Sequence, residues 1–147
     1  MLQLLKVLDI WTHNLELGGN IDVIYTDLEK AFDKVPHRRL ISKLKSYGIN
    51  ADVVAWIEAF LSNRRQRVKI NNAFSDWASV LSGIPQGSFL GPLLFIIYIN
   101  DLVDSCSNGS ELYLYADDAK LFKHILSGLD RELLQRDLDN LNSWTEK

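Results

Sequence analysis

Apolar positions recur along the chain at two spacings, and together they predict five helices, one strand and two hairpins. Helical spacing marks the segments 2–17, 35–48, 50–63, 90–103 and 127–144. A nearly continuous apolar run rich in β-branched residues, 21–28, predicts a central strand. Two pairs of shorter β-rich runs, at 64–81 and 112–122, predict the hairpins. This order is typical of the α+β class, with an antiparallel sheet covered on one face by helices.

Residues that favour helix ends stand at the borders of the helical segments. Gly18 and Gly19 end the first helical pattern, and Gly48 ends the second. Pro36 suits the first turn of the second helix, and Asn50 is a candidate N-cap for the third. These positions support the first three helices independently of the apolar spacing.

Composition places the chain among ordinary globular proteins. Its 147 residues, 47% hydrophobic and 24% charged, fit one domain or part of a larger one. The longest apolar run, 92–99, is too short to cross a bilayer, and no targeting signal or basic leader is visible at the N-terminus. The single cysteine, Cys106, excludes an intrachain disulfide and a cysteine zinc site, which suits a reducing intracellular compartment.

Charge is unevenly distributed along the chain. The net charge is −3, yet residues 30–70 carry ten Lys and Arg against three acidic residues, a balance of +7, which leaves −10 for the remainder. A basic middle segment permits a local phosphate-binding face, although a solvated helix surface also produces such a run.

Carboxylates end two of the predicted strands. Asp27 ends the first strand, and Asp117 and Asp118 stand at the tip of the second hairpin. A buried carboxylate pair costs several kcal/mol unless a metal or hydrogen-bond donors compensate it. If the two elements are sheet neighbours, the three carboxylates converge at one edge, where they suit Mg²⁺. The alternative is that Asp27 is a strand-end cap and the pair is turn chemistry.

Three stretches of the sequence resemble reverse transcriptases in order and spacing, in particular those of non-LTR (LINE-type) retrotransposons. They are "YTDLEKAFDKVPH", "GIPQGSFLGPLLFIIYINDL" and "YADD". The resemblance covers residues 1–147 and implies a partial reverse transcriptase domain, a palm-like antiparallel sheet with part of the fingers. In the family, further finger strands precede this region and the thumb follows it. We therefore expect a palm fragment with fingers and thumb largely missing.

The resemblance implies a role for each motif residue. Asp27, Asp117 and Asp118 match the catalytic metal-binding carboxylates, with the Leu28 main-chain carbonyl as a further ligand, for two Mg²⁺ ions or Mn²⁺ in their place. Phe32 matches the steric gate that excludes a ribonucleotide 2′-hydroxyl; the alternative is a core position. Ala31, Phe32, Gln86 and Gly87 match positions that bind the nucleotide, although the loop of Gln86 and Gly87 also suits a plain helix-entry turn, and Tyr115 matches a position near the primer terminus. Arg64, Arg65 and Arg67 are candidates for contact with primer or template phosphates; the alternative is a solvated strand edge.

The implied reaction is RNA-directed DNA synthesis during retrotransposition. Deoxynucleotides from their triphosphates are added to the 3′-hydroxyl of a DNA primer on an RNA template. No membrane is expected as a partner, and the expected location is the nucleus and cytoplasm. Two alternatives stay open. One is a catalytically inactive retroelement remnant; the other is an RNA-templated RNA polymerase, which Phe32 disfavours.

Overall fold

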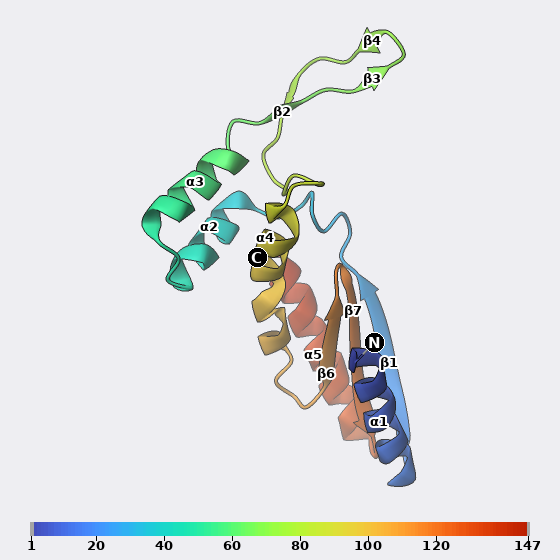
Figure 1. Ribbon diagram of the computed structural model, residues 1–147. Coiled ribbons are helices and arrows are strands. Elements are labelled where there is room, and N and C mark those ends of the chain that lie inside the picture. The colour runs from blue at the N-terminus through green and yellow to red at the C-terminus, as the bar shows by residue number, and fades with distance from the viewer. Residues whose placement is uncertain (1, 147) are drawn as a thin grey trace. The chain divides into compact units, whose positions relative to one another are not determined.

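The computed structural model describes residues 2–146, and of Leu2 only the backbone (Figure 1). The chain forms two compact units. One combines Met1–Leu28 with Asp101–Lys147, and the other is Glu29–Asn100. The motifs are divided between them, because the predicted carboxylate site falls in the first unit and the predicted nucleotide-binding residues fall in the second.

A three-stranded antiparallel sheet forms the centre of the first unit. Its strands are β1 (Asn20–Asp27), β6 (Glu111–Tyr115) and β7 (Asp118–Ile125), in the order β1-β7-β6. The predicted strand at 21–28 and the predicted second hairpin are therefore confirmed. The central strand β7 is the most buried of the three, because both of its edges are paired. The observed α+β class with antiparallel pairing confirms the predicted fold class.

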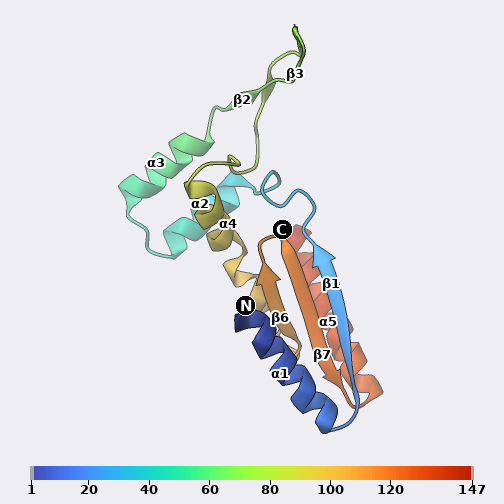
Figure 2. The same ribbon diagram turned by 45° about the vertical axis from the view of Figure 1, so that its right-hand side comes forward.

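Helices lie on both faces of this sheet, whereas the sequence analysis expected them on one. Figures 1 and 2 show α1 (Leu2–Glu16) in front of the strands and α5 (Gly128–Glu146) behind them. Trp11 of α1 packs edge-on against Phe122, with 5.7 Å between the ring centroids. Arg131 of α5 instead pairs with Asp22, whose side chain points to the opposite face. Large side chains on both sheet faces require this cover.

The apolar stripe predicted for α1 is only partly covered. Val7 is buried and Trp11 half-buried, but most of the leucines that define the helical pattern are more than half exposed: Leu4, Leu5, Leu8 and Leu15. Helical periodicity identified the helix correctly without identifying which side faces the sheet.

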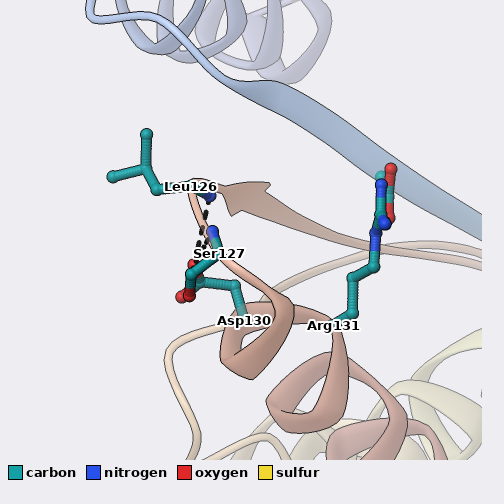
Figure 3. A network of polar contacts seen from close by, with 5 residues as sticks. Leu126, Ser127, Asp130 and Arg131 are labelled. Atoms are coloured by element: carbon teal, nitrogen blue, oxygen red, sulfur yellow. Dashed lines mark hydrogen bonds and ion pairs between the residues drawn. The ribbon is translucent and has the colours of Figure 1, made fainter.

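The first turn of α5 is fixed by a carboxylate that accepts three hydrogen bonds (Figure 3). Asp130 accepts from the backbone N–H groups of Leu126 and Ser127, at 3.1 and 2.8 Å, and from the Ser127 hydroxyl at 2.9 Å. The Ser127 hydroxyl and the Leu126 amide hold the pKa of Asp130 below its usual value. The otherwise unpaired donors at this helix start are thus satisfied by a side chain one turn into the helix.

A buried carboxylate ties α5 to the loop before β6. Asp137 is completely buried and accepts from the Asn108 backbone N–H and side-chain amide and from the Ser110 N–H, at 3.2, 2.8 and 3.3 Å. Burial raises the pKa of Asp137, but hydrogen bonds from Ser110 and Asn108 outweigh it and leave the pKa below its usual value. Lys123 donates to the Asn108 carbonyl at 2.9 Å. This polar cluster positions the strand that leads into the second hairpin.

Three helices form the body of the second unit. They are α2 (His37–Ser46), α3 (Ala51–Leu61) and α4 (Leu90–Ile99), and their buried leucines form the core: Leu40, Leu44, Leu61 and Leu94. Asn50 caps α3 as predicted, accepting from the Asp52 N–H at 2.8 Å. The helix expected to run to Val103 ends four residues earlier, and a 3₁₀ turn, η1 (Asn100–Ser105), follows it.

The first predicted hairpin is present as an interrupted ribbon between α3 and α4. Strand β2 (Arg65–Gln66) pairs with β5 (Ala78–Ser79), and β3 (Lys69–Ile70) pairs with β4 (Ala73–Phe74). Within residues 2–146, no helix combines the length and apolar character that crossing a membrane requires.

Candidate active site

Two of the three predicted catalytic carboxylates face one another across the sheet of the first unit. Asp27, the last residue of β1, is the direct register partner of Asp118, the first residue of β7. Residues opposite one another in an antiparallel pair point to the same face. Both carboxylates therefore project from the same face at the same end of the sheet, from positions 91 residues apart in sequence.

The tight turn of the second hairpin brings Asp117 to this end of the sheet. Ala116 and Asp117 form a two-residue loop between β6 and β7, and Ala116 has a φ of 54°. The Leu28 N–H donates to the Asp117 carbonyl at 3.2 Å, which ties the exit of β1 to the turn. The strand ends thus meet as expected, while the catalytic and metal-binding roles of these residues stay predictions.

The three carboxylates are accessible to solvent. Asp27 and Asp118 are exposed and Asp117 is half-buried. The sequence analysis treated the pair as buried and in need of compensation, and this was wrong, because Asp118 is exposed and Asp117 only half-buried. Lys120 is the nearest downstream cation, but it does not form an ion pair with these carboxylates. Its ammonium lies 5.5 and 5.0 Å from the ring centres of Trp11 and Tyr25.

A cavity of about 450 Å³ borders the carboxylates on the face covered by α1. Asp27 and Asp118 line it together with Tyr25, Tyr113 and Tyr115. Tyr115, predicted to lie near the primer terminus, is 77% exposed. Burial and the neighbouring Glu111 raise the pKa of Tyr113, whose hydroxyl donates to the Glu111 carboxylate at 3.2 Å.

The donor set at this edge suits a hard divalent cation. Within residues 2–146, no three His, Cys, Asp or Glu side chains are placed closely enough to form a complete metal site. Mg²⁺, however, takes only one or two protein carboxylates and completes its octahedral shell with water and substrate phosphates. Two facing, solvent-accessible carboxylates beside a third therefore fit such an ion without a closed protein cage.

The residues predicted to bind the nucleotide come together in the second unit. The Ile84 N–H donates to the Phe32 carbonyl at 2.8 Å, which holds the Pro85–Gly87 loop beside Phe32. Phe32 lines a cavity of about 520 Å³ together with Gln86, Gly87 and Phe89. Phe32, Gln86 and Gly87 therefore lie around one cavity, as expected for residues that share a site, while their nucleotide-binding role stays a prediction.

Phe32 also has the core contacts considered as its alternative role. Its half-buried ring stacks on that of Phe95, with 4.3 Å between the centroids. Ala31 is half-buried as well, whereas Gln86 is exposed. Gly87 has a φ of 80° with open space where a Cβ would lie, so its backbone conformation, and not close packing, favours glycine.

The basic residues predicted to contact the primer or template lie at the interrupted ribbon of the second unit. Arg65 and Arg67 are exposed and Arg64 is half-buried. Sequence reasoning missed the aromatic residues beside them, although the exposed positions of Phe74 and Trp77 in a predicted hairpin were a signal. Arg67 lies 4.0 Å from the Phe74 ring centre and 4.5 Å from that of Trp77.

A family model described as reverse transcriptase (RNA-dependent DNA polymerase) matches residues 5–147. The chain belongs to the reverse transcriptase family. The match includes both strand ends that carry the facing carboxylates in the first unit and the loop beside Phe32 in the second.

Curated relatives of this reverse transcriptase domain come from mobile elements. It is 33% identical over 135 residues to a probable RNA-directed DNA polymerase from transposon BS of Drosophila melanogaster, covering 86% of this chain and 15% of the relative. It is 31% identical over 152 residues to the RNA-directed DNA polymerase from mobile element jockey of Drosophila funebris, covering 99% and 16%. A retrovirus-related Pol polyprotein from a type-1 retrotransposable element of Popillia japonica is 26% identical over 86 residues, covering 58% and 14%. The predicted non-LTR resemblance is confirmed, and the chain spans about 15% of the length of the first relative.

Proposed function

We propose that this reverse transcriptase domain supplies the metal-binding carboxylates and part of the nucleotide pocket for RNA-directed DNA synthesis. The observation that carries the proposal is the register pair of Asp27 and Asp118 beside Asp117. Such an edge attracts divalent cations and, through them, phosphates. An RNA template, a DNA primer and deoxynucleoside triphosphates are the partners, and the nucleus and cytoplasm are the proposed location.

Asp27, Asp117 and Asp118, with the Leu28 carbonyl, are the groups that would hold two Mg²⁺ ions, or Mn²⁺ in their place. Bound there, the ions supply charge neutralisation at the attacking 3′-hydroxyl and the leaving pyrophosphate. The exposure of Asp27 and Asp118 leaves room for substrate phosphates and water in the remaining coordination positions.

The residues of the second unit position the nucleotide in this proposal. The Phe32 ring, held against Phe95, presents a rigid obstacle to a 2′-hydroxyl and selects deoxynucleotides by steric exclusion. Half-buried Ala31 leaves space for the sugar, and the Gln86–Gly87 backbone approaches the base. Tyr115 contacts the primer terminus, and Arg64, Arg65 and Arg67 contact phosphates.

Primer extension tests the proposal. A longer protein that joins this chain to the finger and thumb segments of a relative should extend a DNA primer on an RNA template with Mg²⁺. Asp117→Ala should abolish extension, whereas Asp104→Ala, at an exposed site in η1, should leave it unchanged. The chain alone should not extend a primer at a useful rate, because misplacing reacting groups by about 1 Å costs roughly a hundredfold.

The inactive-remnant alternative predicts a different result. No metal-dependent product would then appear even from the longer protein, although the same fingers and thumb support synthesis when joined to the relative's own palm. Equal activity in Asp117→Ala and the unchanged protein would contradict the assigned role of the carboxylate.

A further inference from the structure

The ribbon between α3 and α4, residues 64–80, here called the arm, has no core of its own. Every residue from 65 to 79 is exposed, including Phe74 at 50% and Trp77 at 52%. Figures 1 and 2 show the arm projecting away from α2, α3 and α4 of its own unit. A two-stranded hairpin is marginally stable alone in water, and large exposed rings usually mark an interaction surface.

Cations and aromatic rings share one face of the arm. Arg65, Arg67 and Lys69 each lie over the ring of Phe74 or Trp77. Lys69 is the register partner of Phe74, and its ammonium lies 5.5 Å from that ring centre. Arg65 lies 5.4 Å from the Trp77 ring centre. The face therefore presents three cations against two rings, with Arg67 in contact range of both.

The charges of the arm are not neutralised by the chain. Residues 64–80 carry four basic residues against Asp76, a net charge of +3, and none of the four forms an ion pair within residues 2–146. At the base of the arm, the buried Arg64 Nη1 has no hydrogen-bond acceptor in that part of the chain. A guanidinium whose plane lies on a ring keeps its N–H edge free for a phosphate oxygen.

We infer that the arm binds single-stranded nucleic acid, with its cations on the phosphates and with Phe74 and Trp77 stacking on unpaired bases. Positive grooves with aromatic platforms bind single strands in this way, because an unpaired base exposes its face whereas a duplex hides it. The inference rests on the proposed function for the origin of the strand, which is the RNA template before it pairs.

A second copy of the chain fits this surface less well. The paired segments β2–β5 and β3–β4 are only two residues long on each strand, so few consecutive backbone groups are available for strand addition. Two arms of charge +3 would also repel each other. Phosphates complement the charge directly.

Fluorescence anisotropy of the purified chain with short labelled oligonucleotides tests the inference, in chelator and without deoxynucleotides. Single-stranded RNA and DNA should bind more tightly than a duplex of the same length. Trp77→Ala should weaken single-strand binding by about 5- to 150-fold. Trp77→Phe should retain most of it, and Trp56→Ala, which removes a 58% exposed tryptophan on α3, should change nothing.

The ionic part of the contact has its own readout. Arg67→Gln should reduce the slope of log K against log salt by about 0.7, whereas Arg38→Gln, at an exposed site on α2, should leave it unchanged. Unchanged circular dichroism and thermal unfolding of Trp77→Ala would show that the variant is folded.

Three results would overturn the inference. The first is equal affinity for duplex and single strand, and the second is an equal effect of Trp77→Ala and Trp56→Ala on binding. The third is an arm that binds anionic vesicles or a second copy of the chain but no oligonucleotide. Because no metal or synthesis is involved, failure of the polymerase proposal leaves this binding result intact. Conversely, loss of oligonucleotide binding leaves primer extension to be judged separately.

Discussion

Asp27 and Asp118 are direct cross-strand partners in the β1–β7 register, and both point from the same face of the sheet. Like charges placed opposite one another destabilise a sheet unless something neutralises them. The pair therefore costs the sheet a small amount of stability when no cation is bound.

Removing one of these charges should stabilise the chain when no metal is present. Asp118→Asn is expected to raise the free energy of unfolding in chelator by about 0.2–0.5 kcal/mol, a small value because the carboxylates are exposed. The same variant should gain less stability from added Mn²⁺ than the unchanged chain, because a ligand is lost. Thermal unfolding with and without Mn²⁺ measures both, with Asp104→Asn as the control. A clear loss of stability in chelator would show that Asp118 is a structural hydrogen-bonding residue.

The hairpin turn beside these carboxylates stores backbone strain. Ala116 has a φ of 54° at the first position of a two-residue loop, where glycine is favoured. Ala116→Gly should therefore raise the free energy of unfolding by about 0.5–1 kcal/mol, after allowance for the greater freedom of glycine in the unfolded chain. Ala116→Val should lower it, because a β-branched residue tolerates this φ poorly. Urea unfolding measures both, and equal stability of all three proteins would argue against strain at this turn.

Acid should weaken the contact between α5 and the loop before β6. The pKa of Asp137 is lowered in the folded state, so its contribution to stability is complete above its usual value of 3.8 and is lost as pH falls through the folded-state pKa. Asp137→Asn should cost about 1–3 kcal/mol near pH 6, because an amide N–H would face the donors of Asn108 or Ser110. Urea unfolding from pH 6 to pH 2 measures the difference.

The difference between Asp137→Asn and the unchanged chain should shrink at the acid end of that range. Asp139→Asn, two residues along the same helix and exposed, provides the control and should cost much less. A pH-independent difference would mean that the carboxylate charge contributes nothing to the cluster.

Phe32 can be separated from an ordinary core residue by its effect on sugar selection. In the longer active protein, Phe32→Val should raise the ratio of ribonucleotide to deoxynucleotide incorporation several-fold, because the gate acts by exclusion. Phe60→Val, which shortens a half-buried aromatic residue of α3, should leave the ratio unchanged. Single-nucleotide incorporation with matched ribo- and deoxynucleoside triphosphates measures this ratio. An unchanged ratio in Phe32→Val would return Phe32 to a purely structural role against Phe95.

Local signals predicted most of the elements. Asn50 and Gly48 mark helix ends because capping and positive φ depend on one or two residues, and the structure has them as expected. Apolar spacing found α1 but not its buried side, because the packing partner Phe122 lies far along the chain. One local signal pointed to the burial of Asp137, because this residue stands between Leu134 and Leu141 on the apolar side of α5. Its partners, 27 and 29 residues earlier, could not be found from spacing.

The site was predicted in parts. Strand ends and the Asp-Asp turn are local features, so the convergence of Asp27 with the hairpin could be expected once the two were assumed to pair. The exposure of the carboxylates could not be expected from the sequence, because it depends on where the strands end relative to the helices around them. The rings beside Arg67 were likewise missed, since the strand pairing that places Phe74 opposite Lys69 depends on the register of an interrupted ribbon.

Paramagnetic broadening by Mn²⁺ tests the central claim most directly, because it locates the ion on the chain itself without synthesis or added domains. In two-dimensional amide spectra, substoichiometric Mn²⁺ should first broaden the signals of Asp27, Leu28, Asp117 and Asp118, and an excess of Mg²⁺ should reverse the effect. Asp27→Asn should weaken this broadening. Broadening that begins instead at acidic residues of α5, or that is unchanged by Asp27→Asn, would contradict the assignment of this sheet edge as the metal site.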